Sequence, residues 1–495
     1  MKLRNDLTRV LSNKLSVIEK NKTLAGFGWN FINQFGVQFL NLLFSIFLAR
    51  LLSPEEYGLI AMVTIFTGFS AVLLDFGFGN ALIYKDNPTN KDWSSVFWFN
   101  TIVGGIICLI IILFSEKIAG FYNEEVLQPI AVFLSFNFVF NAMSITQNAK
   151  IRKAIDFKSL ASVNLISIIF SGIVGIVFAL SNYGVWSLVA QRLTDSFCRF
   201  IGLFIVTKWF PVYGFSINSI RAIFGYSIYS FGANIIAYWS RNLDNLLIGR
   251  FVNKVELGLY SRAYTFLMFP ITSISRVIST VLFPTFSKIK NDIDKIKTNY
   301  LAISRMVAFI VFPLMLILFL GAKEITLLVF GVQWLPMAPY LKLFSFIGMY
   351  QSLLGLNGPL YMALGKTKLN FQLNLFTQLV NISALIIGVN WGVYGIITAI
   401  YVATCINFFP VNYFILKELK IRFFEPYLKV LPILGLNCIA FIPLYFLPFT
   451  IVNSTLVLLG FKVLSYLFVY VCLAKLTKNK ELDFILKIIK QKIKK

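Results

Sequence analysis

The sequence predicts an all-α, polytopic membrane protein, and three observations lead to this fold class. The chain has 495 residues, of which 58% are hydrophobic and 13% are charged, whereas about a quarter of a soluble chain is charged. Its apolar residues lie in long blocks, each of which could cross about 30 Å of hydrocarbon as a helix. Two segments of the first half also recur in the second half, which predicts an internal repeat.

The residue types make several kinds of site improbable. The chain has no histidine, the usual metal ligand and the usual proton carrier at neutral pH. Five cysteines are scattered through apolar runs without CxxC spacing. We therefore expect no metal site, no disulfide framework and no cofactor. The sequence also contains no GxxxxGK[ST] motif, so no nucleotide-binding loop is expected.

Residues 1–22 are predicted to form a basic amphipathic helix on the membrane surface, because leucines recur there at helical spacing between Lys and Arg. The apolar run that follows is too long for a signal peptide. Fourteen spans are then expected: 24–52, 57–83, 93–114, 118–146, 159–181, 184–208, 222–251, 255–284, 301–320, 335–363, 369–389, 391–415, 427–449 and 453–475. The tail 476–495 is basic and amphipathic, so we expect a second surface helix there.

The net charge of +24 could suggest a nucleic-acid partner, but the distribution of the charge favours membrane topology. Of the 45 Lys and Arg residues, 33 fall in alternate loops and in the two tails, and five fall in the opposite loops. Such an imbalance is typical of cytoplasmic segments. It predicts both termini in the cytoplasm and an even number of spans. The excess charge is then explained by topology and by anionic lipid, and no nucleic acid is expected.

The internal repeat defines two lobes. LARLLSPEEYGLI (48–60) aligns without a gap with IGRFVNKVELGLY (248–260), and NYGVW (182–186) recurs as NWGVY (390–394). Each pair is separated by six predicted spans, an even number, so both copies enter the membrane from the same side and the repeats are parallel. We expect an N-lobe over 24–208 (spans 1–6), a C-lobe over 222–415 (spans 7–12) and two extra C-terminal helices over 427–475.

A family resemblance is visible in LARLLSPEEYGLIA, LLDFGFGNALI, RKAIDFKSLA and RNLDNLLIGRF. These segments resemble the Wzx-type oligosaccharide flippases of the polysaccharide transporter family, whose superfamily also holds multidrug exporters and lipid II flippases. The resemblance covers essentially the whole chain. It implies movement of an undecaprenyl-diphosphate-linked oligosaccharide to the outer leaflet of the bacterial cytoplasmic (inner) membrane, by alternating access between two lobes.

Ionisable residues at membrane depth are costly, so they are the first candidates for function. The candidates for a cationic site that binds the substrate diphosphate are Arg192, Arg199, Arg241, Arg262 and Lys342. The candidates for coupling to Na⁺ or H⁺ are Asp244, Asp195 and Asp75. The alternative is that these groups pair with each other and hold helices in register, as Arg241 and Asp244 could at a spacing of three. Lys462 lies outside the repeat, and we interpret it as a side chain that extends toward the membrane surface.

Uncharged polar residues form stripes on three predicted spans, because they advance by three or four. The stripes that we expect to face a sugar are Asn30, Gln34, Gln38 and Asn41, then Asn234 and Tyr238, and finally Asn370, Asn374 and Gln378. Hydrogen bonding between helices is the simpler explanation. We favour a hydrated cavity, because two of the stripes lie on repeat-related helices and sugars need many amide and hydroxyl partners.

Two other functions stay open. A multidrug cation antiporter of the same superfamily should carry embedded carboxylates, whereas basic groups outnumber acidic ones inside these spans. A membrane glycosyltransferase or polymerase usually carries a large outer loop, whereas every outer loop predicted here is short. We therefore expect a transporter rather than an enzyme.

Overall fold

A computed structural model describes residues 28–29, 32–74, 78–216, 235, 238–446 and 454–493. The described part of the chain is almost entirely helical and contains no strand, which confirms the predicted all-α class. The chain divides into two compact units, Met1–Leu246 and Leu247–Lys495. The boundary between them lies inside the predicted seventh span, and the two predicted C-terminal spans belong to the second unit.

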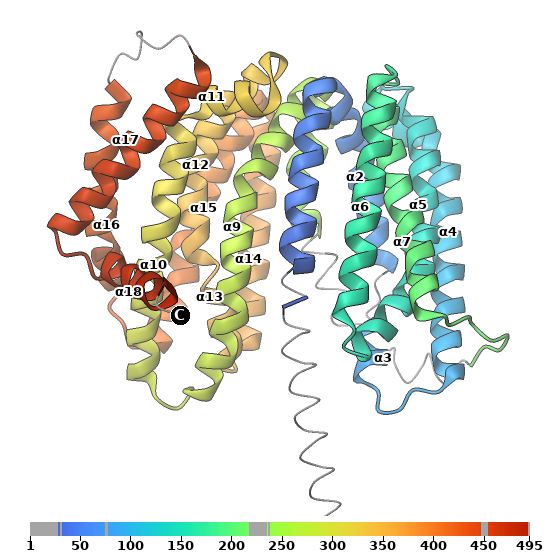
Figure 1. Ribbon diagram of the computed structural model, residues 1–495, viewed down its shortest axis with the longest axis horizontal. Coiled ribbons are helices and arrows are strands. Elements are labelled where there is room, and N and C mark those ends of the chain that lie inside the picture. The colour runs from blue at the N-terminus through green and yellow to red at the C-terminus, as the bar shows by residue number, and fades with distance from the viewer. Residues whose placement is uncertain are drawn as a thin grey trace, which may run out of the picture. The chain divides into compact units, whose positions relative to one another are not determined.

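Unit 1 begins its described part with the helix Ile32–Leu51. It continues with α2 (Pro54–Leu74), α3 (Phe78–Tyr84), α4 (Asn90–Tyr122), α5 (Leu127–Lys153), α6 (Phe157–Leu180) and α7 (Trp186–Thr207). The predicted second span contains α2 and most of α3, and residues 75–77 between them lie outside the described part of the chain. A further helix over 238–251 crosses the boundary between the units. Figure 1 shows α4, α5, α6 and α7 as a bundle of roughly parallel axes with short connections at both ends.

Unit 2 contains the long helices α9 (Lys254–Lys288) and α10 (Ile293–Leu320), followed by the short helix α11 (Ala322–Ile325), a π-helical turn (Thr326–Phe330) and a 3₁₀-helix (Val332–Met337). Next come α12 (Ala338–Leu354), α13 (Asn357–Ala363), α14 (Thr367–Gly388), α15 (Gly392–Glu418), α16 (Glu425–Phe446) and α17 (Thr455–Leu476). The last described helix is α18 (Lys480–Ile493), which contacts α10 and α17 and runs across the lower part of α10 in Figure 1.

Nine helical segments of the described residues are long and apolar enough to cross a membrane, and one of them, Thr367–Glu418, contains both α14 and α15. The helix α7 is not among them because it carries three charged residues, and α12 has only 17 residues. The protein is therefore a multi-pass membrane protein. The number of fourteen spans stays a prediction.

The repeat has a counterpart in three dimensions, through a direct contact in unit 1 and through an intervening tyrosine in unit 2. In unit 1, the Glu56 carboxylate at the start of α2 packs against Gly184, so close that a Cβ there would lie 2.5 Å from its Oε1. In unit 2, Glu256 at the start of α9 accepts a hydrogen bond from Tyr340, whose ring packs on Tyr394 at 5.4 Å. Each unit therefore brings its copies of the two repeated sequence segments together.

The starts of these repeated helices are determined by local sequence. Ser53 and Glu56 form reciprocal hydrogen bonds at the start of α2, with the Ser53 backbone donating to Glu56 at 2.6 Å. Asn253 accepts from the backbone N–H of Glu256 at 2.8 Å and caps α9. Both arrangements satisfy amide groups that a helix end leaves unpaired. The polar breaks in the sequence therefore become tight corners between long helices.

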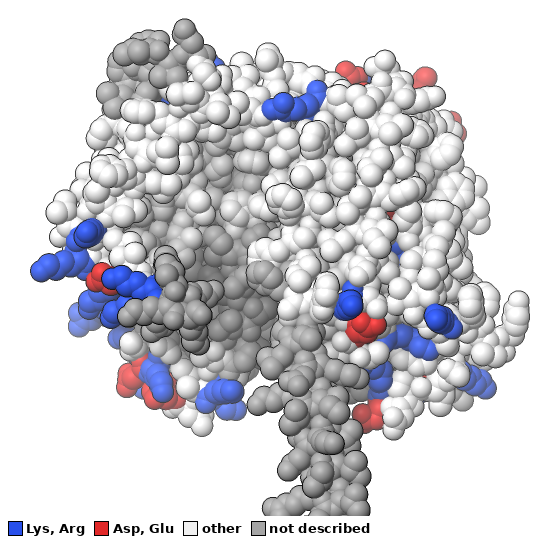
Figure 2. Space-filling model, viewed as in Figure 1, with Lys and Arg blue, Asp and Glu red and all other residues white. Residues whose placement is uncertain are grey.

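Charged side chains are unevenly distributed on the visible face. In Figure 2 the middle of each unit is mostly free of charge, and the basic side chains gather mainly in the lower half of the view. Large apolar side chains such as Leu113, Phe468 and Leu464 are more than 60% exposed. Exposed apolar surface on this scale would be unfavourable in water and suits contact with lipid.

Candidate functional site

The three charged residues of α7 have different surroundings, although their spacing of three and four places them on one face. Arg199 donates to Asp195 one turn away, with 3.0 Å between Nη2 and Oδ2. Arg192 reaches another helix and donates to the Thr64 hydroxyl of α2 at 2.6 Å. About a third of each side chain of the Arg199–Asp195 pair is exposed. An ion pair with this exposure contributes little to the stability of the helix. It also leaves the Arg199 guanidinium accessible.

Arg241 and Asp244, predicted as a possible pair, are not joined. The structure describes both residues and contains no ion pair between them; Arg241 is exposed and Asp244 is buried. One Asp244 oxygen accepts from the Asn245 backbone at 2.8 Å. Tyr238, on the same helix, donates to the carbonyl of Ile65 at 2.6 Å and so attaches this helix to α2. Tyr238, rather than an Arg241–Asp244 pair, therefore connects this helix to α2 in the described residues.

Three basic residues of unit 2 have different surroundings. The Lys342 ammonium on α12 lies 5.7 Å from the centre of the Phe319 ring, within the range of a cation–π contact. Arg262 is half-buried on α9. Lys462, which we interpreted as a side chain extending toward the surface, instead forms a buried ion pair with Glu324 at 2.7 Å. The sequence offered no sign of this pair, because Glu324 lies 138 residues away.

The polar stripe on α14 lines a cavity inside unit 2. This cavity measures about 370 Å³, and Asn370 and Asn374 lie in its wall, whereas Gln378 is not among its lining residues. Most of the other polar lining comes from α12, α13 and α15: Tyr350, Gln351, Asn357, Thr404 and Asn407. No Lys, Arg, Asp or Glu is among the lining residues that the structure describes. The wall is therefore neutral and rich in amides.

Hydrogen bonds order part of this wall and leave other groups available. Asn407 donates to Asn381 at 3.1 Å, and Tyr300 donates to Asn357 at 3.2 Å. The Tyr350 hydroxyl and the Asn407 carbonyl oxygen are buried and make no hydrogen bond. Buried polar atoms without a partner are costly and normally bind water or a ligand. Sequence reasoning missed Tyr350 and Asn407, because neither belongs to a stripe.

The other predicted stripes are only partly described. On the helix Ile32–Leu51, Gln34 and Gln38 are half-buried and Asn41 is exposed. A neighbouring amide, Asn33, accepts from Asn164 of α6 at 3.0 Å and joins these two helices. Three predicted residues lie outside the described part of the chain: Asn30, Asn234 and Asp75.

A second cavity lies inside unit 1 and has a different chemical character. It measures about 330 Å³, and Arg199 lines it together with Arg152 of α5. Arg152 was not among the predicted site residues, although it belongs to the RKAIDFK segment. The sequence-equivalent of Arg199 in unit 2 is Asn407, at the displacement of the NYGVW repeat. Equivalent positions therefore line a basic cavity in one unit and an amide cavity in the other.

No group of three or more Asp, Glu or Cys side chains that could hold a metal ion occurs in the described ranges. The chemistry available in the two cavities is therefore that of amides, hydroxyls and guanidinium groups. Such groups bind by hydrogen bonding and charge. They can hold sugars or phosphates without breaking a bond.

Comparison with known sequences is consistent with this chemistry. A family model described as polysaccharide biosynthesis protein matches residues 47–339. The chain is 25% identical over 445 residues to the lipopolysaccharide biosynthesis protein WzxC of Escherichia coli, covering 88% of this chain and 87% of that protein. It is also 25% identical over 350 residues to the teichuronic acid biosynthesis protein TuaB of Bacillus subtilis, covering 70% and 72% of the two chains.

A solved structure also has a similar fold. The inward closed conformation of the lipid II flippase MurJ matches with a TM-score of 0.72 over 90% of this chain and 98% of that one. The sequence identity is 16%, so this likeness concerns the arrangement of helices. Substrate and mechanism do not follow from fold alone.

Proposed function

The chain belongs to the family of polysaccharide biosynthesis proteins, and from this premise we propose that it is a flippase for lipid-linked oligosaccharides. Its substrate is an undecaprenyl-diphosphate-linked repeat unit, which it moves from the cytoplasmic to the outer leaflet of the bacterial cytoplasmic membrane. Both termini lie in the cytoplasm, as the charge distribution predicts. The two lobes provide access to each side in turn. The relatives' roles in polysaccharide biosynthesis support this function.

The observation that carries the proposal is the amide-lined cavity of unit 2. A sugar presents hydroxyl groups around its ring, and each hydroxyl both donates and accepts. Asn370, Asn374 and Gln351 offer donors and acceptors at the cavity wall, and Tyr350 and Asn407 contribute unpaired buried atoms. A drug-binding cavity for organic cations would instead need an acidic or mainly apolar wall. The neutral amide wall therefore favours an oligosaccharide.

The basic residues at membrane depth are proposed to attract the diphosphate of the same substrate. Arg241 is the most accessible of them, because it is exposed and makes no ion pair with the nearby Asp244. Guanidinium groups match phosphate oxygens with two parallel hydrogen bonds, which an ammonium cannot do. Arg241→Lys is therefore expected to retain only part of the activity of the unaltered protein.

An ion gradient is proposed to drive transport, with Na⁺ or H⁺ as the coupling ion. Asp244 is the better placed of the two described candidates, because it is buried, whereas Asp195 is partly exposed. A buried carboxylate can bind a cation or a proton in exchange for a conformational change. Asp75 stays a third candidate.

The proposal can be tested with purified protein in liposomes that contain a fluorescent undecaprenyl-diphosphate-linked oligosaccharide. Transport is measured as the fraction of labelled lipid that becomes accessible to an impermeant reagent on the opposite side. Asn374→Leu is expected to slow transport at least fivefold. Gln372→Leu, on the same helix but outside the cavity lining, serves as the matched control.

Two results would contradict the proposal. One is equal scrambling of the lipid by the protein and by protein-free liposomes. The other is cleavage or extension of the oligosaccharide during the assay, which mass spectrometry of the recovered lipid would detect and which would indicate an enzyme. Uptake of an organic cation in place of the lipid would favour the multidrug antiporter.

A further inference from the structure

The basic cavity of unit 1 lies among α2, α3, α5 and α7. Its volume of about 330 Å³ falls within the usual range for small-ligand sites, about 300–1,000 Å³. Asn141, Asn148 and Arg152 of α5 line it at intervals of seven and four, which places them on one face of that helix. Arg199 lines it from α7. Four side chains that can donate hydrogen bonds therefore converge on one space from two helices.

The three basic residues at the end of α5 have separate roles. The Lys150 ammonium lies 4.3 Å from the ring centre of Trp209 and 5.3 Å from that of Trp93. Lys153 donates to three carbonyl groups at the end of α3, those of Leu82, Ile83 and Lys85. Arg152 is exposed, and its side chain makes no recorded hydrogen bond or ion pair within the described residues. Lys150 and Lys153 therefore stabilise contacts within unit 1, and the Arg152 side chain is available to a ligand.

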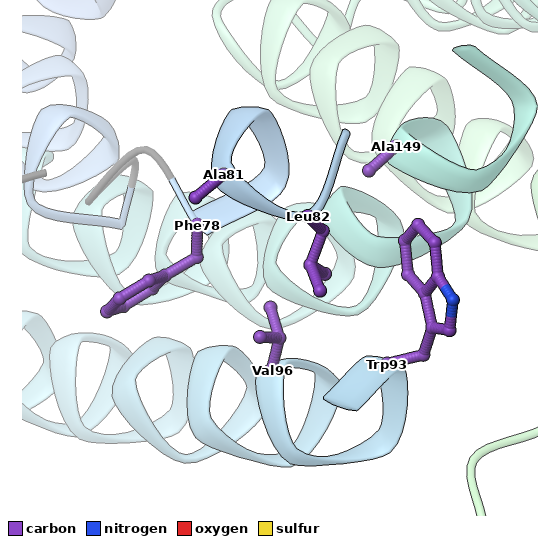
Figure 3. Close-up of a cluster of buried hydrophobic side chains, with 6 residues drawn as sticks. All are labelled: Phe78, Ala81, Leu82, Trp93, Val96 and Ala149. Atoms are coloured by element: carbon purple, nitrogen blue, oxygen red, sulfur yellow. The ribbon is translucent and has the colours of Figure 1, made fainter. Parts of the chain in front are cut away.

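A buried apolar cluster supports one wall of the cavity. Figure 3 shows Phe78 and Leu82 of α3 packed with Val96 of α4 and close to Trp93 and Ala149. All five side chains are at most 6% exposed. Because Ala149 also lines the cavity, this apolar cluster forms part of its wall. A preformed site loses less conformational entropy when a ligand binds.

The charge of the cavity points to an anion. Asp195 offsets the charge of Arg199, and nothing recorded in the described residues offsets that of Arg152. The amides of Asn141 and Asn148 make no recorded hydrogen bond in the described part of the chain, so their N–H groups can also donate. Two guanidinium forks and two amides match the several oxygens of a phosphate better than the two oxygens of a carboxylate.

We propose that this cavity is a binding site for a phosphate group, with Arg152 and Arg199 as its principal ligands. The charge distribution predicts that its end of unit 1 faces the cytoplasm. If the proposed flippase function holds, the phosphate is the diphosphate of the incoming lipid-linked substrate, bound before the oligosaccharide is moved. The chemistry recognised is the phosphate itself, whether it is carried by that lipid, by an ordinary anionic lipid or by a free ion.

The test measures binding to the full-length protein in nanodiscs of uncharged phosphatidylcholine. The probes are undecaprenyl diphosphate, phosphatidylglycerol and inorganic pyrophosphate, each titrated separately. Arg152→Gln is expected to raise the Kd for undecaprenyl diphosphate at least tenfold, because one charge-assisted guanidinium contact is lost. Arg152 is exposed and makes no recorded contact that folding needs, so this variant should fold normally.

Lys91→Gln provides the matched control. It removes one positive charge from the start of α4, where Lys91 is exposed and is not part of the cavity lining. Its Kd should equal that of the unaltered protein. Tighter binding of undecaprenyl diphosphate than of phosphatidylglycerol would identify the substrate as the source of the phosphate. Equal binding of the two lipids would support a general site for lipid phosphate, and binding of pyrophosphate alone would support a site for a free ion.

An unchanged Kd for every probe in Arg152→Gln would overturn the site. The same variants are then assayed for transport in liposomes. If the unaltered protein transports lipid-linked oligosaccharide while Arg152→Gln binds and transports equally well, the site is wrong and the flippase function stands. If the unaltered protein binds phosphate in this cavity but moves no lipid, the flippase function is wrong and the site stands.

Discussion

Replacing Lys462 with methionine should destabilise the attachment of α17 to unit 2. The ammonium of Lys462 lies 2.7 Å from Glu324 Oε1, and it also donates to the carbonyl of Leu320 at 3.3 Å. The two side chains are only 14% and 7% exposed. The second carboxylate oxygen of Glu324 is buried and makes no hydrogen bond. Methionine has a similar length and no charge, so it isolates the loss of the ammonium.

The size of the effect follows from the burial of Glu324. Removing one partner of a buried ion pair typically costs about 3–5 kcal/mol, because the other charge is left without compensation. Few side chains of α17 are buried, namely Tyr466, Tyr470 and Ala474, so little apolar packing would offset the loss. We therefore expect Lys462→Met to lower the free energy of unfolding by roughly 3 kcal/mol or more.

The measurement is an unfolding titration with sodium dodecyl sulphate in mixed micelles. Lys475→Met, at an exposed position of the same helix, is the control and should change stability little. The double variant Lys462→Met with Glu324→Gln should recover most of the lost stability, because it removes both charges. Stability equal to the unaltered protein in Lys462→Met would refute the reasoning. So would a double variant as unstable as the single one.

Three further predictions follow from the fold and the charges. Gly184→Ala should destabilise unit 1 by roughly 1–3 kcal/mol in the same titration, because φ is +55° and a Cβ would lie 2.5 Å from the Glu56 carboxylate; an unchanged midpoint would contradict this. In a cysteine-free background, a cysteine at Asn253 should react with an impermeant thiol reagent added outside, and one at Asn291 should not; the reverse pattern would invert the proposed topology. Asp244→Asn should slow ion-driven transport several-fold, and an unaltered rate under an imposed gradient would remove this carboxylate from the coupling mechanism.

Much of the fold could be predicted because the bilayer restricts the structure of each apolar segment, whatever its neighbours are. A long apolar run must form a helix in lipid, since no other local structure pairs its own backbone groups. Most predicted spans accordingly lie on helices in the described residues, although the turn between α4 and α5 lies at 123–126, inside the predicted span 118–146. The predicted span 335–363 is divided at 354–357, where the short helix α13 follows α12. Hydropathy is averaged over many residues, so it could not locate this break.

The candidate site was less predictable, because spacing along one helix does not determine partners on another. The spacing of Arg199 and Asp195 allowed an ion pair, and the pair is present; the spacing of Arg241 and Asp244 also allowed one, and it is absent. Asn370 and Asn374 lie in the wall of a cavity, whereas Gln378, one turn further along, is not among its lining residues. Rotation about the helix axis by about 100° per residue decides which neighbour a side chain meets.

The sequence by itself determined the membrane class, the helical fold, the repeat and the family, because hydropathy, charge asymmetry and repeated motifs are properties of the linear chain. Only the tertiary structure decided which polar side chains already have partners in hydrogen bonds, ion pairs or cation–π contacts. Lys150, Arg152 and Lys153 are close neighbours in the sequence, yet their contacts differ. Lys150 lies against two indole rings, Lys153 donates to carbonyl groups of α3, and Arg152 lines a cavity. Likewise Lys462 meets Glu324 only because folding brings α17 against α11. These contacts join residues tens to more than a hundred positions apart, and local sequence carries no signal for them.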